Sequence, residues 1–377
     1  MRLSCLQENL SRGLGLVGRA VATRTTLPIT SHVLIATEQS RLKLVATNLE
    51  IAISCWIGAK VEEEGTVAIP AGLLTDFINS LPPEKIDISV APGTQTMELR
   101  CAKFEARISG QKAEEFPPIP QIGEGIGTKI EPNLLRTAIN QVVFAASTED
   151  SRPVLTGCHA QFTGDKLTLA AADGFRLAVH ELPLATPVSE EIGIIIPARS
   201  LKELDRLLRD QEEPVELTIN PQRSQVLFRL KNAELVSQLI QGTFPNYSQL
   251  IPQSYVTRAI INVSEFLRAI RSAAVFARDG RGIVRLVITP GGELSPGKIT
   301  ISARAEEIGD NLGEIDAMVE GEEAKIAFNS KYLMDVFNVL EEEQVAFETT
   351  SPSSPGVFRP VGVSNWVQVI MPMFVQW

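Results

Sequence analysis

The sequence predicts an α+β protein made of three copies of one domain, each with two helices packed on antiparallel sheet. The first observation is a repeat: a leucine that begins a helical pattern recurs 125 and then 132 residues further on, at Leu10, Leu135 and Leu267. The second observation is a further helix that the copies share. The third is a set of segments near the end of the copies in which apolar and polar residues alternate, as they do in strands. Solenoid repeats are roughly 20 to 50 residues long, so this one has the size of a whole domain.

Each copy opens with apolar residues spaced three and four apart, the period of an amphipathic helix. In the first copy they are Leu10, Leu14, Val17 and Val21, which predicts a helix that reaches residue 21. The other copies repeat the pattern at Leu135, Ala138, Ile139, Val142 and Ala146, and at Leu267, Ile270, Ala274 and Ala277. A helix is therefore expected near the start of every copy.

The second helix of each copy is predicted from the residues that begin it. Pro70 and Pro197 stand where a helix starts, a position at which the missing N–H of proline costs nothing. The third copy has Asn329 and Ser330 there, and both residue types cap helix N-termini. These helices are expected to run to about Leu81, Leu208 and Leu340.

Alternating apolar residues predict strands after the second helix, and glycines indicate a domain boundary. Residues 86–90 and 215–219 alternate as half-buried strands do. Gly123, Gly125 and Gly127 suggest a linker near residue 124, and the second boundary is placed near residue 254. The predicted domains are residues 1–124, 125–254 and 255–377.

Composition narrows the class of protein. The chain has 44% hydrophobic and 21% charged residues, an ordinary globular balance. Its four cysteines lie far apart without a CxxC pair, which predicts neither a zinc site nor a disulfide framework. The N-terminus lacks a signal-peptide pattern, and no apolar run is long enough to span a membrane. A cytoplasmic protein without a membrane partner is therefore expected.

Basic residues gather on the repeated helices although the net charge is −10. The acidic balance argues against broad adhesion to nucleic acid, which depends on Lys and Arg neutralising phosphates. A local basic surface is still compatible with it. Solvated helix faces and a phosphate-facing surface both explain the clusters. The residues concerned are Arg199, Lys202 and Arg206 in the second copy, Arg268 and Arg271 in the third, and Arg24 after the first helix.

Two motifs could indicate catalysis or a cofactor, but their context supports neither. Residues 13–18 match the dinucleotide fingerprint GxGxxG, yet they lie inside a predicted helix, where glycines allow close packing. Cys158 and His159 are neighbours, and neighbouring strand residues point to opposite faces, so they could not share a proton. With no HExxH or GxSxG motif, the sequence predicts no catalytic residue, no metal site and no cofactor.

Two other stretches are unusual. Residues 169–177 form an apolar strand that ends in the turn former Asp173-Gly174, and residues 44–50 have the same pattern. The C-terminus is apolar, with Met371, Met373, Phe374 and Trp377. Such an end is usually a final strand in a core, but flexible methionines also suit a groove that accepts several apolar partners.

Several motifs in order resemble one known family. They are residues 26–29 (TLPI), 172–179 (ADGFRLAV), 244–247 (FPNY), 328–340 and 369–373 (VIMPM). Together they resemble the bacterial DNA polymerase III beta subunit, the replicative sliding clamp family, over essentially the whole chain.

The resemblance implies an architecture and a set of partners. Two chains would join head to tail as a homodimer, and their six domains would form a closed ring around double-stranded DNA. Helices would line the hole and contact phosphates without reading sequence, which permits sliding. The implied function is to confer processivity by tethering the DNA polymerase III alpha subunit, and the clamp loader and other proteins with a clamp-binding motif would share the same pocket. No catalytic site of its own is implied.

The resemblance also assigns residues to three surfaces. Arg24, Arg152 and Arg199 match DNA-facing positions, and the helical cations Lys202, Arg206, Arg268 and Arg271 are placed with them. The subunit interface would use Phe104, Val275 and Phe276. The partner-peptide pocket would use Leu155, Ala172, Gly174, Phe175, Arg176, Leu177, Pro245, Leu250, Val369, Ile370, Met371, Pro372 and Met373. Two alternatives remain at this point: a monomeric peptide-binding adaptor, and a DNA-modifying enzyme built from repeated domains.

Overall fold

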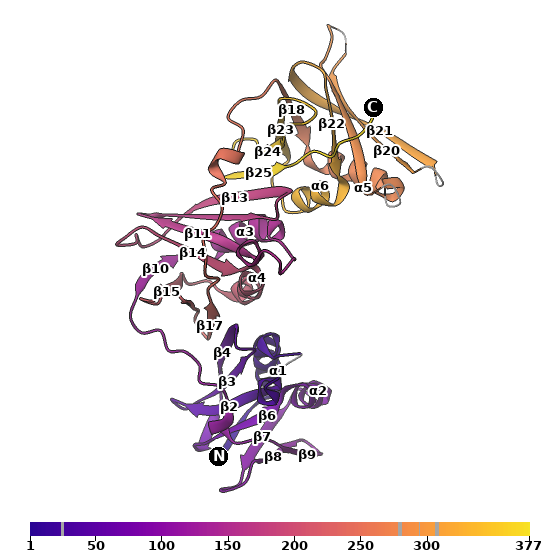
Figure 1. The fold of residues 1–377 in the computed structure, drawn as a ribbon. Helices are drawn as coiled ribbons and strands as arrows, with labels where there is room; N and C mark the ends of the chain where they lie inside the picture. The colour runs from indigo at the N-terminus through magenta and orange to yellow at the C-terminus, as the bar shows by residue number, and fades with distance from the viewer. Residues whose placement is uncertain (24–25, 278–280, 294, 306–308) are drawn as a thin grey trace. The chain divides into compact units, whose positions relative to one another are not determined.

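The structure is a computed structural model that describes residues 1–23, 26–277, 281–293, 295–305 and 309–377 (Figure 1). The chain divides into two compact units. Unit 1 contains residues 1–133, 184–190 and 199–239, and unit 2 contains residues 134–183, 191–198 and 240–377. Antiparallel sheets and helices make up both, which confirms the α+β prediction. The domain boundaries near residues 124 and 254 stay a prediction.

Unit 1 contains two sheets. The five-stranded sheet has the order β5 (Lys60–Glu63), β1 (Arg2–Leu6), β7 (Lys85–Val90), β8 (Thr96–Cys101) and β9 (Phe104–Ser109). The eight-stranded sheet has the order β10 (Ile126–Ile130), β15 (Val215–Ile219), β16 (Gln225–Arg229), β17 (Ala233–Gln238), β4 (Ile51–Gly58), β3 (Arg41–Thr47), β2 (His32–Glu38) and β6 (Thr66–Pro70). Because β4 pairs with β17, strands of the first and central copies form one continuous sheet.

Unit 2 contains a twelve-stranded sheet. Its order is β14 (Ile192–Pro197), β11 (Gly157–Thr163), β12 (Lys166–Ala172), β13 (Arg176–Pro183), β25 (Trp366–Ile370), β24 (Gly356–Pro360), β23 (Gln344–Thr349), β18 (Thr257–Asn262), β21 (Gly309–Gly321), β20 (Gly297–Ala305), β19 (Ile283–Thr289) and β22 (Ala324–Asn329). The pairing of β13 with β25 joins the central copy to the third.

Among the described residues, each copy contains two α-helices, as predicted. They are α1 (Gln7–Val17) and α2 (Ala71–Ser80), α3 (Pro132–Val142) and α4 (Ala198–Leu207), and α5 (Val263–Ala277) and α6 (Ser330–Phe337). Short 3-10 helices lie between elements: η1 (Gly18–Ala20), η2 (Pro28–Ser31), η3 (Ala113–Glu115), η4 (Val143–Ala145), η5 (Pro153–Thr156), η6 (Leu208–Asp210) and η7 (Ser248–Leu250).

Three helices end earlier than their apolar patterns predict. The first α-helix stops at Val17 and tightens into a 3-10 turn, so Val21 lies outside it in extended backbone. The third α-helix stops at Val142 and tightens into the 3-10 helix Val143–Ala145, so Ala146 lies outside it in extended backbone. The sixth stops at Phe337, three residues before Leu340, where Asn338 caps it. Apolar spacing continues through these turns because their side chains still contact the core, which a periodicity argument cannot tell from helix.

Gly13 explains the glycine-rich sequence of α1. A Cβ atom on Gly13 would lie 2.8 Å from Leu44 Cδ1 and 3.2 Å from Ile57 Cγ2, so only glycine lets the helix approach the sheet this closely. Gly15 and Gly18 have open space beside them. The GxGxxG match is therefore a packing feature at its first glycine, as the sequence analysis favoured.

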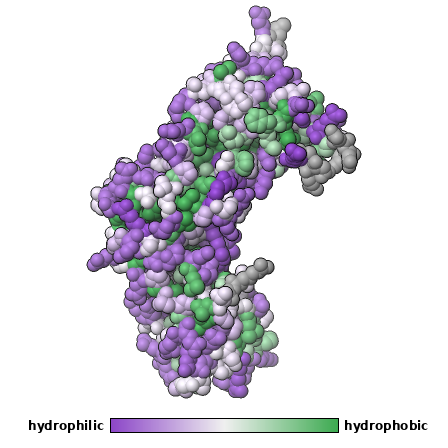
Figure 2. All heavy atoms as spheres, in the orientation of Figure 1, coloured by the Kyte–Doolittle hydropathy of each residue, from purple (hydrophilic) through white to green (hydrophobic). Residues whose placement is uncertain are grey.

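Most of the face shown in Figure 2 is hydrophilic, with hydrophobic atoms in separate small patches. Among the described residues, no helix is both long enough and apolar enough to cross a membrane.

Candidate functional site

The turn between β12 and β13 carries the centre of the candidate site. Asp173 Oδ1 accepts hydrogen bonds from the backbone N–H groups of Phe175 (2.9 Å) and Arg176 (3.0 Å), which closes the turn. Gly174 has a φ of +95°, a conformation that suits glycine. Arg152 lies against this glycine and donates from Nη2 to the carbonyl oxygen of Asp173 at 3.2 Å. Residues 172–177 are therefore held in one shape.

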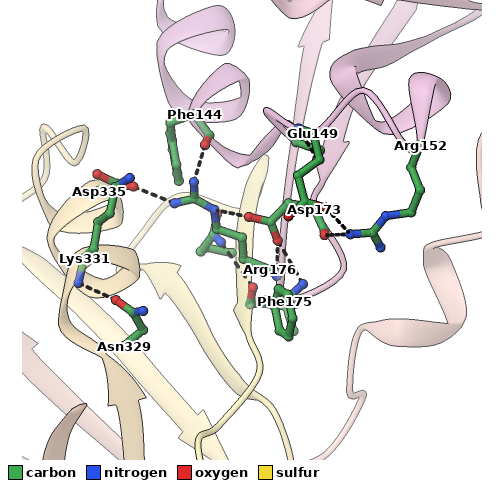
Figure 3. Close-up of polar contacts among 12 residues, drawn as sticks. Phe144, Glu149, Arg152, Asp173, Phe175, Arg176, Asn329, Lys331 and Asp335 are labelled. Atoms are coloured by element: carbon green, nitrogen blue, oxygen red, sulfur yellow. Dashed lines mark hydrogen bonds and ion pairs between the residues drawn. The ribbon is translucent and has the colours of Figure 1, made fainter. Parts of the chain in front are cut away.

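Arg176 links this turn to the third copy, as Figure 3 shows. Its Nε donates to Asp173 Oδ2 at 3.0 Å, and its Nη1 donates to Asp335 Oδ2 on α6 at 2.6 Å. Its Nη2 donates to the carbonyl oxygen of Phe144 at 2.6 Å. The guanidinium therefore connects three segments of unit 2.

Two aromatic rings flank the buried Arg176 guanidinium. The guanidinium carbon lies 4.5 Å from the ring centre of Tyr332 and 5.4 Å from that of Phe144, in cation–π range. Burial, together with the charge of Asp173, raises the pKa of Tyr332, so this phenol stays protonated. Arg176 is 9% exposed, and each of its three guanidinium nitrogens donates a hydrogen bond within the protein. Its assignment to the partner-peptide pocket stays a prediction.

Apolar side chains from both joined copies form the base of the candidate pocket. Leu177 and Val369 are cross-strand partners in β13 and β25, and they pack in one cluster with Ala172 and Tyr247. Leu155 belongs to a neighbouring cluster that also contacts Ala172 and Tyr247. The structure thus brings together the central turn, the 244–250 segment and β25, as the sequence analysis expected.

The rim of the pocket is unusually apolar for a protein surface. Phe175 is 58% exposed and Met371 is 42% exposed, and the Met371 N–H donates to the Phe175 carbonyl oxygen at 2.8 Å. Pro245 and Leu250 are exposed on the linking segment. Phe374 on the C-terminal tail is 87% exposed, while Pro372 and Met373 are half-buried. An exposed apolar patch of this kind is typical of a binding surface.

Ile370 lies on the other side of the sheet from Val369, and its assignment to the pocket stays a prediction. Its side chain is fully buried in the core of the third copy, with Phe328 and Trp366. Side chains alternate along a strand, so Val369 faces the pocket and Ile370 faces the opposite side of the sheet.

His159 lies beside the pocket in an aromatic group. Its ring stacks on Phe244 with centroids 5.4 Å apart, and Tyr247 meets it edge-on at 6.1 Å. Burial lowers the pKa of His159, which keeps the ring neutral near pH 7. Cys158 is fully buried in the same strand and faces away from that group, so the two do not form a nucleophile and base.

The basic candidates differ in how free their charges are. Arg199, Lys202 and Arg206 are exposed along α4, spaced three and four apart, which places them on one side of the helix. Arg206 forms an ion pair with Glu203 on the same helix: its Nη1 donates to both carboxylate oxygens, at 2.6 and 2.7 Å.

The other basic candidates lie on different elements. Arg268 and Arg271 are exposed on α5, and Arg271 donates to Asn338 Oδ1 at 2.7 Å. Arg152 is tied to the pocket turn and to Glu149, 3.6 Å away. Arg24 lies outside the described residues.

The interface candidates are exposed, and the structure adds a feature that the sequence analysis missed. Phe104 begins β9, the edge strand of its sheet, and Val275 is exposed on α5, whereas Phe276 packs partly against its own core. Residues 309–316 of β21 pair on one side with β20 and on the other have no strand partner among the described residues. Leu312 on this free edge is 71% exposed. A single unpaired edge leaves no mark in a sequence pattern.

The described residues do not form a metal-binding site. The described part of the chain holds no group of three or more His, Cys, Asp or Glu side chains suited to a metal ion. The four cysteines are buried.

Three family profiles match the chain in succession. They describe the N-terminal, central and C-terminal domains of the DNA polymerase III beta subunit, and they match residues 1–120, 129–246 and 248–374. The chain belongs to the DNA polymerase III beta subunit family. The family's order of domains thus accounts for the three copies seen in the sequence and for the sheets that join them.

Family members with known names match along almost their full length. The beta sliding clamp of Bacillus subtilis is 33% identical over 383 residues, with 99% of each chain covered, and that of Synechocystis is 31% identical over 397 residues, also with 99% coverage. The crystal structure of the Bacillus subtilis clamp superimposes with a TM-score of 0.93 over 100% of both chains, at 32% identity. A Pseudomonas aeruginosa clamp bound to griselimycin gives a TM-score of 0.92 at 27% identity over 100% of both chains.

Proposed function

We propose that this chain, a replicative sliding clamp by family, works as a head-to-tail homodimeric ring that encircles double-stranded DNA and confers processivity on DNA polymerase III. The single observation that carries the proposal is the full-length match to beta sliding clamps, in sequence and in fold. A DNA-modifying enzyme and a monomeric adaptor are not favoured, because the matched proteins are clamps over their entire length. Cytoplasmic localisation follows as part of the same proposal.

Charge supports the DNA contact. Free cations on α4, Arg199 and Lys202, would face phosphates, while the net charge of −10 would repel DNA from the rest of the surface. Contacts to phosphates alone carry no sequence information, so the ring could slide. We include Arg24, Arg152, Arg206, Arg268 and Arg271 in the candidate surface, with Arg206 weakened by its bond to Glu203.

Unpaired strand edges support the dimer. The free edge of β9, with exposed Phe104, and the free edge of β21, with exposed Leu312, would pair between two chains. Each chain offers both edges, so a head-to-tail arrangement would close with two chains and leave neither exposed. Val275 and Phe276 on α5 would add apolar contacts.

The pocket in unit 2 would receive a short peptide from the polymerase alpha subunit, the clamp loader or another partner. Leu177, Val369 and Leu155 supply an apolar floor, and Phe175 with Met371 supplies a rim that buries more of the ligand. Few polar groups converge there, which suits apolar anchor side chains.

Retention on circular DNA is the central test. We expect a solution mass of twice the chain's 41.1 kDa, and loading onto nicked circular DNA by the cognate clamp loader with ATP. Cutting the circle should release the protein, because a ring held by topology slides off a free end. Light scattering gives the mass, and gel filtration of labelled protein with DNA gives retention.

Two results would contradict the ring. A monomer that is never retained on circles would exclude it, and retention that survives linearisation would indicate ordinary DNA binding. The double variant Arg199→Glu, Lys202→Glu is a useful companion: it should reduce loading while leaving the dimer mass unchanged, because neither residue lies at the proposed interface.

Removing residues 372–377 should weaken binding of the polymerase alpha subunit by at least about tenfold, the equivalent of one buried apolar side chain. This truncation keeps Ile370, whose burial holds β25 in the sheet, and removes the apolar tail residues Met373 and Phe374. Surface plasmon resonance with the immobilised alpha subunit measures the affinity, and circular dichroism checks the fold. A folded truncation with unchanged affinity would show that the tail takes no part.

A further inference from the structure

A second hollow, of about 400 Å³, lies within unit 1 at the junction of the first and central copies. Its apolar lining comes from three segments: β2 and β3, β16, and the linker that connects the two copies. The apolar residues are Leu34, Val45, Ile119, Ile122 and Leu227. A volume of this size is within the range of sites that bind small ligands or side chains.

The turn beside this hollow repeats the turn of the candidate peptide pocket. Asn48 Oδ1 accepts hydrogen bonds from the N–H groups of Glu50 (3.0 Å) and Ile51 (2.9 Å). Asp173 accepts the equivalent pair at the pocket. Leu49 has a φ of +77°, in the same left-handed region as Gly174. The two junctions therefore have the same local backbone.

Strand register is also the same at both junctions. Ala52 of β4 pairs with Val236 of β17, as Leu177 of β13 pairs with Val369 of β25. A Phe-Pro pair begins the linking segment in both cases, at Phe116 and at Phe244. The face of unit 1 that carries the hollow is thus the structural counterpart of the face that carries the pocket in unit 2.

The two units differ in the side chains of the next row across the paired strands, beside the hollow. In unit 2 the row is Ala170, Val179 and Val367, which pack together and fill the space. In unit 1 the same row is Val45, Ser54 and Glu234. In unit 1 the smaller, polar Ser54 thus stands where unit 2 has Val179, and the charged Glu234 stands where unit 2 has Val367. The unit 1 cavity lies beside this row, whereas the unit 2 row is packed with valines.

Some polar groups in and beside the hollow make no hydrogen bond to another described residue. Ser54 is 5% exposed and lines the cavity, and none of the hydrogen bonds among the described residues involves its hydroxyl. The backbone C=O groups of linker residues 119–123, and the N–H groups of these residues other than Pro120, likewise make no backbone–backbone hydrogen bond within the described chain. An extended peptide offers the main-chain groups that such a segment can pair with.

Charges around the hollow are already paired. Glu38 accepts a hydrogen bond from Trp56 Nε1 at 2.7 Å and lies 3.0 Å from Lys43 Nζ. Arg229 Nε lies 2.9 Å from Glu234. Hydrogen bonds from Trp56 and Lys43 lower the pKa of Glu38, which keeps the pair charged. A charged ligand would have to break one of these pairs, whereas an uncharged one would leave them intact.

We propose that the unit 1 hollow is a second peptide-docking site, which takes an extended partner segment with an aliphatic side chain flanked by uncharged polar residues. The aliphatic side chain occupies the apolar lining, a polar neighbour bonds to Ser54, and the main chain runs along linker residues 119–123. The proposal rests on the proposed function of the unit 2 pocket, whose face it repeats. It would let one clamp hold a partner at two points.

The test uses fluorine NMR on the protein lacking residues 372–377, a truncation that is expected to weaken the unit 2 pocket and that removes Trp377. Two tryptophans remain, Trp56 in the hollow and Trp366 in a core, and 5-fluorotryptophan reports on each. The probes are capped hexapeptides with a fixed leucine flanked by Ser, Thr, Asn or Gln, and a matched set flanked by Asp or Lys. We expect only the uncharged set to shift the Trp56 resonance, at peptide concentrations below roughly 1 mM, which is about 4 kcal/mol of binding.

Ser54→Val supplies the decisive variant, because valine is the counterpart residue in unit 2 and suits a strand. It should weaken peptide binding at least about tenfold, while Thr218→Val, on a strand outside the hollow, should leave it unchanged. The proposal is overturned if no peptide shifts the Trp56 resonance, or if the Ser54→Val variant binds the peptides as tightly as the protein with Ser54. If the untruncated clamp still binds the polymerase alpha subunit in that case, only the second site has failed.

Discussion

Replacing Arg176 with methionine should lower both the free energy of unfolding and the affinity for the polymerase alpha subunit. Methionine keeps the length of the side chain but leaves Asp173 and the Phe144 carbonyl without their charged donor. Removing one partner of a buried ion pair usually lowers the free energy of unfolding by about 3 to 5 kcal/mol. We expect about 3 kcal/mol here, the lower end of that range, because Asp335 is partly exposed. The turn at residues 173–176 would loosen as well, and peptide affinity should fall at least about tenfold.

Arg152→Met is the matched control for that experiment. Its guanidinium contacts the same turn but is partly exposed, so its loss should cost well under 1 kcal/mol of stability, as surface pairs do. Urea unfolding followed by fluorescence measures the stability of each variant, and calorimetry with the alpha subunit measures affinity. Equal stability of Arg176→Met and the unchanged protein would mean that the network does not hold the two copies together.

Acidification should weaken the junction between the central and third copies through His180. Its Nδ1 lies 2.8 Å from Gln141 Oε1, and its Nε2 lies 3.2 Å from the amide nitrogen of Asn365. Burial lowers the pKa of His180 from 6.5 to about 4, although the nearby Glu181 opposes the shift. The ring is therefore neutral in the folded protein at pH 7.

Proton binding to His180 determines whether the free energy of unfolding rises or falls with pH. Between pH 6.5 and pH 4 the unfolded chain binds a proton at His180 that the folded chain does not, so unfolding is favoured as the pH falls. The free energy of unfolding should drop by about 3 kcal/mol across this window and stay constant above it. Urea midpoints measured at half-unit pH steps give the profile.

His180→Asn provides the comparison, because His32 and His159 have lowered pKa values too and contribute to any acid sensitivity. The asparagine variant should be less stable at pH 7 but show a flatter profile between pH 6.5 and pH 4. Parallel profiles for the two proteins would assign the acid sensitivity elsewhere.

Local pattern was enough to place most elements. Apolar spacing located the helices and the proline or Asn-Ser starts located their N-termini, because both signals come from residues close in the chain. The ends were less accurate, at Val21, Ala146 and Leu340, because a side chain can face the core from a 3-10 turn as well as from a helix. Residues near the turn at Asp173 were grouped as a candidate pocket only through the family resemblance, and that assignment stays a prediction.

Contacts between distant segments were beyond the reach of the sequence. Asp335 and Phe144 lie far from Arg176 along the chain, so nothing near Arg176 indicated that its charge would be used inside the protein. The free edge of β21 and the hollow beside Ser54 were missed for the same reason, since each depends on which strand lies next to which.

The sequence by itself determined the three copies, their helices and strands, and the family, because these depend on periodicity and on motifs read along one chain. Only the tertiary structure decided which side of a sheet each side chain faces. Ile370 and Val369 are neighbours with similar side chains, yet Ile370 packs in the core of the third copy and Val369 packs in the cluster at the candidate pocket. That choice depends on strand register across β13 and β25, and register is set by packing between segments that are about 190 residues apart.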